Sequence, residues 1–150
     1  MSFGELLDEK LIKSQLKGGD KFAIIEELLD LIASAGKLRD KSLALQDCIK
    51  REKYLSTGLE NGLAIPHAKT EATGELLMSF GISREGIEFD SLDGKPAHFI
   101  FLLLSPVNTS GPHIKVLSQI TRLFRQKDIT GRLLQAAGPE EILAILKSPI

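Results

Sequence analysis

The sequence predicts an α/β protein in three layers, α/β/α, with a mixed parallel and antiparallel β-sheet flanked by helices. Helical periodicity fills the first and last thirds of the chain, and short apolar strands fill the middle. The run 97–104 (AHFIFLLL) is apolar on both faces, as a central strand covered by two layers should be. One domain over residues 1–150 is expected, since the chain has no repeat, linker or low-complexity tract.

The first third is expected to contain one short strand and two helices. Residues 10–17 alternate weakly between apolar and polar, as a short strand does, and a glycine pair follows them. Asp20 is the expected N-cap of a helix that stops at Gly36, because apolar residues between them recur at helical spacing. A second helix is expected to begin near Asp40 and to end around 51–54.

The rest of the chain is expected to hold the sheet and then three more helices. Residues 62–67 (GLAIPH) and 75–83 are typical of strands, and the pair Asp93-Gly94 signals a turn before the central strand. The expected helices are 112–126, about 128–137 and a final one opened by Pro139.

Composition excludes several classes of function. With 43% hydrophobic residues, 26% charged residues and a net charge of -1, the chain is predicted neither to be disordered nor to attract nucleic acid. The single cysteine, Cys48, cannot form an internal disulfide and is expected to pack inertly on a helix face. The start MSFGELLDEKLIKSQ lacks signal-peptide features, and the longest apolar run, 99–104, is too short to span a bilayer. We expect a cytoplasmic protein without direct membrane insertion.

One histidine stands directly after a proline at the end of an apolar segment. Pro66 has no N–H and pushes Ile65 toward an extended conformation, so the strand is predicted to stop where His67 begins. His67 would then lie at the carboxyl edge of the sheet, where ligands bind in open α/β folds. Taken alone, His67 also fits an ordinary loop residue.

A second histidine and an arginine could reach the same edge. Ser110 or Gly111 is expected to cap a helix with Pro112 in its first position, which puts His113 in the first turn. That turn attracts anions and disfavours a charged imidazolium, so a neutral His113 could donate to phosphate. Arg51 could also bind phosphate oxygens, although each of these two residues fits a plain structural role as well.

These residue types together favour nucleophilic phosphoryl transfer. A neutral imidazole presents a lone pair without a separate base, and histidine is a recognised covalent nucleophile. His67 would take the phosphoryl group, while His113 and Arg51 would stabilise its charge. No cofactor and no metal are expected.

The motifs resemble those of a known family. The matching stretches are REKYLSTGLENGLAIPHAKT (51–70), GIEFDSLDGKPAHFIFLLLSP (86–106) and GPHIKVLSQITRLF (111–124). They are similar to the IIA components of the fructose and mannitol class of the bacterial phosphoenolpyruvate-dependent phosphotransferase system. The resemblance implies that His67 is phosphorylated by the phosphocarrier HPr and donates to a IIB domain. It also implies that His113 helps to hold the phosphoryl group, that Arg51 lies near it, and that a mixed sheet lies between helical layers.

Two branches of that family remain open. Nitrogen-regulatory relatives share the Ser-Thr-Gly and Ile-Pro-His pieces and act by binding other proteins according to phosphorylation state. The segment PHAKT favours the sugar branch. A regulatory protein that controls transporters or kinases is therefore the alternative function.

Other chemistries are less well supported by the sequence. A metal site made by His67, His98 and His113 lacks the close helical spacing of zinc ligands. A hydrolase would need a nucleophile elbow, and a nucleotide site would need a glycine-rich phosphate loop. Polar residues that could support the phosphoryl site are Glu52, Ser56, Thr57 and Asn61, with Lys69 as a residue that could steer an acidic partner.

Overall fold

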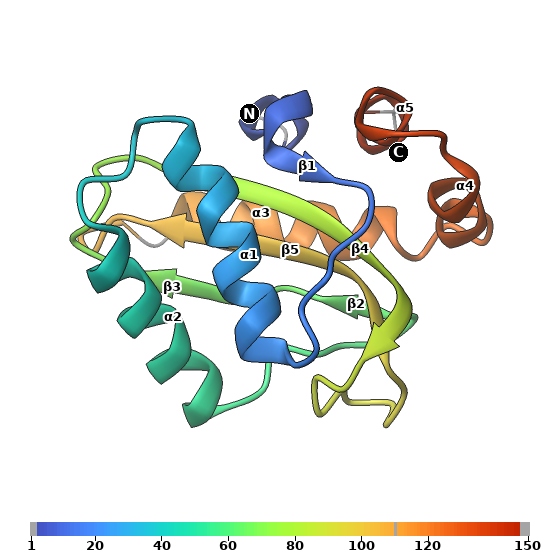
Figure 1. The fold of residues 1–150 in the computed structure, drawn as a ribbon, viewed down its shortest axis with the longest axis horizontal. Helices are drawn as coiled ribbons and strands as arrows, with labels where there is room; N and C mark the ends of the chain where they lie inside the picture. The colour runs from blue at the N-terminus through green and yellow to red at the C-terminus, as the bar shows by residue number, and fades with distance from the viewer. Residues whose placement is uncertain (1–2, 110, 148–150) are drawn as a thin grey trace.

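The computed structural model describes residues 3–109 and 111–147 (Figure 1). The helices are α1 (Lys21–Ser34), α2 (Lys41–Tyr54), α3 (Gly111–Leu123), α4 (Ile129–Gln135) and α5 (Pro139–Leu146). The strands are β1 (Ile12–Lys13), β2 (Leu63–Ala64), β3 (His67–Lys69), β4 (Leu77–Ile87) and β5 (Ala97–Ser105). Two short 3-10 turns, η1 (Phe3–Leu6) and η2 (Glu9–Leu11), precede β1.

The first two helices begin where the sequence predicts. The Asp20 carboxylate accepts a hydrogen bond from the Ala23 backbone N–H at 2.9 Å, and the Asp40 carboxylate accepts one from the Leu43 N–H at 3.1 Å. Each bond satisfies one of the free N–H groups of a first helical turn. Gly36 follows α1 with a φ of 84°, a left-handed conformation that suits glycine. The predicted N-cap at Asp20, the predicted helix start near Asp40 and the glycine stop are therefore confirmed.

The sheet is mixed, as predicted. Its strand order is β1-β4-β5-β2, and β3 also pairs with β5. β4 and β5 run antiparallel, and the other pairs are parallel. β4 continues past the predicted end at residue 83, because an irregularity between Ile82 and Ile87 lets pairing resume opposite Ala97. Gly86 allows this irregularity with a φ of 86°.

The prediction that the strand stops at His67 is wrong. Leu63 pairs with Phe99 and His67 pairs with Leu103, so β2 and β3 keep one register against β5 on both sides of Pro66. The proline interrupts the ladder only locally, because its carbonyl still accepts the Leu103 N–H at 3.0 Å. His67 is consequently the first residue of a three-residue strand, held by sheet pairing two positions from the carboxyl edge.

The predicted strand at 10–17 is much shorter in the structure. Only Ile12 and Lys13 pair with β4, and Leu16 adds a single backbone bond to Ile82 at 2.8 Å. The N–H groups of the next two residues donate instead to the Glu27 carboxylate of α1, at 2.9 to 3.0 Å. The Glu27 side chain thus accepts the backbone hydrogen bonds that a neighbouring strand would otherwise accept.

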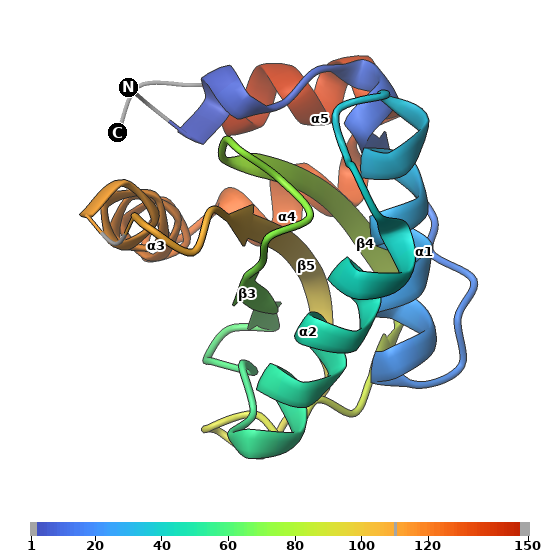
Figure 2. The same ribbon diagram turned by 90° about the vertical axis from the view of Figure 1, so that its left-hand side faces the viewer.

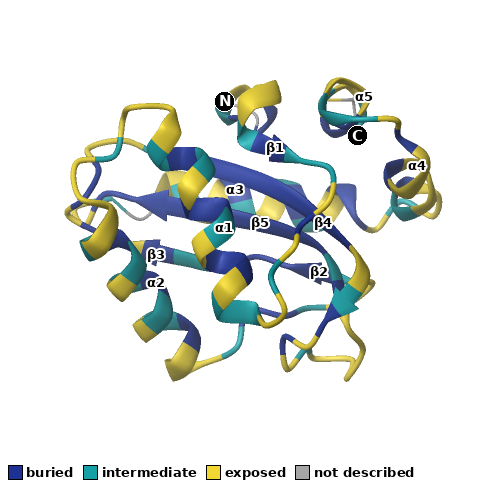
Figure 3. Ribbon diagram, in the orientation of Figure 1, coloured by how far each residue is buried: buried dark blue, intermediate teal, exposed yellow. Residues whose placement is uncertain are grey.

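Helices cover both faces of the sheet. α1 and α2 lie on one face, while α3, α4, α5 and η1 lie on the other (Figures 1 and 2). Each side encloses its own apolar cluster, and β5 and the first seven residues of β4 between them are almost wholly buried (Figure 3). This arrangement confirms the predicted three-layer α/β/α class. None of the helices within residues 3–109 and 111–147 has the length and apolar character needed to cross a membrane.

The buried residues of helix α2 are Ala44, Cys48 and Glu52. Burial raises the pKa of the Cys48 thiol to about 12. The thiolate needed for reactivity is therefore scarce at neutral pH, in agreement with the predicted inert packing.

Candidate functional site

Arg51, His67 and His113 line one open cavity of about 770 Å³. They come from the last turn of α2, from β3 and from the first turn of α3. The other lining residues are Asp47, Lys50, Lys53, Tyr54, Ala68 and Lys69. The three residues singled out in the sequence are thus brought together.

The topology explains this convergence. β3 and β5 are parallel neighbours, so their carboxyl ends reach the same edge of the sheet. α3 starts shortly after β5, which places its N-terminal turn at that edge next to β3 (Figure 2). Gly111 is the first residue of α3. The alternative cap, Ser110, lies outside the described residues.

The ring of His67 has a defined tautomer. Its Nδ1 lies 2.8 Å from the Ile65 carbonyl oxygen. A carbonyl only accepts, so Nδ1 carries the proton and Nε2 keeps its lone pair. Burial lowers the pKa of His67, the bond to Ile65 opposes that shift, and the positive charge of Arg51 adds to it. At neutral pH the ring is therefore uncharged, with Nε2 available as a nucleophile.

His113 faces the same space. Its ring is stacked on that of His67, with centroids 6.4 Å apart and an interplanar angle of 28°. Burial, together with the charge of Lys69, lowers the pKa of His113. Its Nδ1 is buried and has no hydrogen-bond partner in the part of the chain that the structure describes. Since an orphaned buried N–H is rarer than an orphaned acceptor, the proton belongs on Nε2, which then can donate.

Positive charge dominates the cavity wall. Arg51 Nη1 donates to the Leu55 carbonyl at 2.6 Å, which anchors the guanidinium at the end of α2. Lys50, Lys53 and Lys69 add further cationic groups, against one acidic lining residue, Asp47. A cavity with this balance suits an anionic group bearing several oxygens.

A buried network supports the end of α2 from behind. Glu52 is 2% exposed, and its carboxylate accepts the Thr57 N–H at 3.0 Å and the Thr57 hydroxyl at 2.6 Å. Lys21 of α1 lies 3.3 Å from the same carboxylate and 2.9 Å from that of Asp90. Sequence reasoning missed Lys21, because nothing near the start of α1 signals a partner 31 residues further along the chain.

The remaining polar candidates do not line the cavity. Ser56 donates to the Phe89 carbonyl. Asn61 adopts a φ of 61° in the turn before β2 and lines a different cavity. His98 bonds through Nδ1 to the Ser83 carbonyl at 2.9 Å, in keeping with a structural role. Within residues 3–109 and 111–147, no group of three or more His, Cys, Asp or Glu is placed to bind a metal.

Curated relatives fall in one family. Residues 5–148 match the family described as "Phosphoenolpyruvate-dependent sugar phosphotransferase system, EIIA 2". The chain is 36% identical to the fructose-specific EIIA component of Haloferax volcanii, over 91% of this chain and 89% of that protein. It is 34% identical to the fructose-specific EIIABC component of Bacillus subtilis over 97% of this chain, and it spans 23% of that longer protein.

Solved structures agree with this match. The nitrogen regulatory protein IIA-Ntr of Neisseria meningitidis is 36% identical, with a TM-score of 0.88 over 97% of this chain and 99% of that one. The mannitol enzyme IIA of Escherichia coli, solved in complex with phosphorylated enzyme IIB, shares the fold at 22% identity, with a TM-score of 0.79 over 93% of this chain and 96% of that one. A fructose-specific relative and a nitrogen-regulatory structure thus each share 36% of residues with this chain, while the nitrogen regulatory protein of Bradyrhizobium diazoefficiens shares 30%. The chain belongs to the EIIA 2 family of the phosphoenolpyruvate-dependent sugar phosphotransferase system.

Proposed function

We propose that this chain is a phosphoryl carrier in which His67 accepts a phosphoryl group from phospho-HPr and passes it to a IIB domain for sugar uptake. The observation that carries the proposal is the bond from His67 Nδ1 to the Ile65 carbonyl, which leaves Nε2 unprotonated in a cationic cavity. In this role residues 1–150 act as one domain, in the cytoplasm.

The transfer step needs no separate base. The Nε2 lone pair of His67 forms a bond to phosphorus while the phosphorus–nitrogen bond of the donor phosphohistidine breaks, and the released electron pair returns to the donor imidazole. Transfer onward to the acceptor repeats these events with His67 as the leaving group. Because the ring of His67 is neutral beforehand, no proton has to leave it.

The neighbouring residues then stabilise the phosphoryl group. It brings a charge of about -1.5 to -2 and three acceptor oxygens into the cavity. His113 can donate through Nε2, and Arg51 can donate through its guanidinium. Neither residue exchanges covalent bonds. Removing one donor of this kind is expected to slow transfer by about 10²-fold or more.

Family relationships support the partners. A relative is named as an EIIABC component, and the mannitol relative was solved with phosphorylated IIB, so a IIB domain is the proposed acceptor. The second candidate function is regulation of transporters or kinases by phosphorylation-dependent binding. It is favoured by the 36% identity to a IIA-Ntr protein along nearly the whole chain. Under that function the same phosphoryl group would alter a docking surface by its charge.

Intact-mass spectrometry tests the carrier function. The chain is incubated with phosphoenolpyruvate, Enzyme I and HPr, and is compared with His67→Ala and with His98→Ala as a matched control. We expect one acid-labile phosphoryl group on the wild type and on His98→Ala, and none on His67→Ala. An unmodified wild type in the presence of charged phospho-HPr would contradict the proposed donor.

A second assay separates the two functions. The phosphorylated chain is mixed with purified IIB domains, and loss of its phosphoryl mass is followed over time. Transfer to a IIB domain supports the sugar role. No transfer to any IIB domain, together with binding to a transporter or kinase that changes with phosphorylation, would favour the regulatory function.

A further inference from the structure

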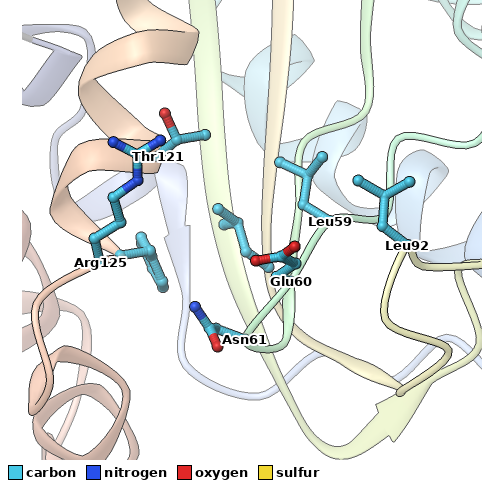
Figure 4. Close-up of a pocket in the computed structure, with 8 residues that line it drawn as sticks. Leu59, Glu60, Asn61, Leu92, Thr121 and Arg125 are labelled. Atoms are coloured by element: carbon cyan, nitrogen blue, oxygen red, sulfur yellow. The ribbon is translucent and has the colours of Figure 1, made fainter.

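A second cavity, of about 240 Å³, lies away from the histidines. Its walls are the C-terminal part of α3 with the two residues just after it, the turn that leads into β2, and the loop between β4 and β5 (Figure 4). The lining residues are Leu59, Glu60, Asn61, Leu63, Leu92, Thr121, Phe124 and Arg125. Thr121 follows His113 by eight residues on α3, or about 12 Å along the helix axis, and no residue lines both cavities.

The inner surface of this cavity is apolar and the rim is charged. Leu63 and Phe124 are buried and belong to the core, and Leu59 packs against it. Leu92, which also lines the cavity, is 78% exposed. The apolar surface is thus available to an aliphatic or aromatic group.

Opposite charges stand on opposing walls. Thr121 projects from α3 and Arg125 from the turn that follows it, and Glu60 and Asn61 project from the facing turn (Figure 4). Neither Glu60 nor Arg125 forms an ion pair with another residue in the ranges 3–109 and 111–147. Each charge therefore keeps its hydrogen-bonding capacity for a ligand.

We propose that this cavity binds a free α-amino acid with an apolar side chain. The Arg125 guanidinium matches the ligand carboxylate, the Glu60 carboxylate matches the ammonium, and the partly exposed Leu59 and the exposed Leu92 contact the side chain. The volume is below the roughly 300 Å³ at which drug-sized pockets begin, which suits a ligand this small. Binding here is independent of phosphoryl transfer, since the two cavities share no side chain.

Solution NMR of the whole chain tests this site. L-leucine, L-methionine and L-phenylalanine are titrated to about 10 mM, because ligands of this size are expected to have dissociation constants of about 1 mM. We expect saturable shifts in the amides of residues 59–63 and 121–125. If none of the three amino acids shifts these amides, the proposal is overturned.

Charge-deleted ligands and variants identify the contacts. Glu60→Gln and Arg125→Gln should each weaken binding of the best amino acid by about tenfold or more, while Glu71→Gln and Arg132→Gln should leave it unchanged. The analogue of leucine without an ammonium, 4-methylpentanoate, should be insensitive to Glu60→Gln. The analogue without a carboxylate, 3-methylbutylamine, should be insensitive to Arg125→Gln. Equal sensitivity of both analogues to both variants would contradict the assigned contacts. His67→Ala should bind the amino acid normally even if it cannot be phosphorylated.

Discussion

Replacing Glu52 by alanine should destabilise the fold more than any change to an exposed acid. The residue is 2% exposed, and its carboxylate accepts two hydrogen bonds from Thr57, besides its ion pair with Lys21. Removal leaves the buried N–H and hydroxyl of Thr57 without this acceptor and Lys21 with Asp90 as its remaining partner. Hydrogen bonds to a charged group contribute about 1.5–3 kcal/mol each. We expect Glu52→Ala to lower the free energy of unfolding by about 3–5 kcal/mol.

Urea denaturation provides the assay and a double-mutant cycle provides the control. Thr57→Val removes the hydroxyl while keeping the shape of the side chain. The double variant Glu52→Ala/Thr57→Val should therefore lose clearly less free energy of unfolding than the sum of the two single variants, with a coupling energy of at least about 1 kcal/mol. Glu71→Ala, on an exposed residue, should change stability by at most about 0.5 kcal/mol. A cost below about 1 kcal/mol for Glu52→Ala, or strict additivity with Thr57→Val, would refute the role given to this network.

Three further predictions concern pH, the thiol and a helix cap. Burial lowers the pKa of His67, so the unfolded chain binds more protons than the folded chain in mildly acidic solution. The contribution of His67 to the free energy of unfolding is then fully present above about pH 6.5 and is lost as the pH falls through the folded-state pKa. On acidification the urea midpoint should therefore fall less for His67→Gln than for the wild type, and an equal fall in both would contradict this. Cys48 should react with a thiol reagent only after unfolding, because burial raises its pKa to about 12, and rapid labelling of the native chain would oppose this. Asp20→Ala should cost about 1 kcal/mol in urea unfolding while Asp20→Asn should cost much less, and equal costs would exclude the capping role.

Local signals account for the parts of the fold that the sequence predicted well. Asp20 and Asp40 cap the helices that follow them through bonds to residues three positions away, so the evidence lies within each segment. Pro139 likewise opens α5 at the first helical position. The helices predicted at 112–126 and about 128–137 are each a few residues shorter, since helix ends depend on packing as well as on pattern.

Partners distant in the chain account for the errors. Pro66 was expected to end a strand, but the Leu103 N–H still bonds to its carbonyl, and that partner cannot be read from residues 62–67. The strand predicted at 10–17 pairs only through Ile12 and Lys13, and near its predicted end the Lys17 N–H bonds to Glu27 of the next helix instead of to a strand. Both errors come from hydrogen bonds formed between elements.

The candidate site divides in the same way. The position of His113 follows from a helix start, which has a sequence signal, whereas His67 opens β3 instead of following a strand end. The ion pair between Lys21 and Glu52 has no such sequence signal, because the two residues come together only when α1 packs beside α2. Asn61 was grouped with the site by nearness in sequence, yet the turn before β2 carries it to the second cavity.

The most direct test of the phosphoryl-carrier proposal is to locate the phosphoryl group on the ring of His67. The chain is phosphorylated through HPr and examined by isotope-edited NMR that correlates phosphorus with the imidazole nitrogens and protons. Because Nδ1 donates to the Ile65 carbonyl, we expect the phosphorus to be bonded to Nε2 of His67. A phosphoryl group on Nδ1 of His67, or on a different residue, would contradict the proposed chemistry.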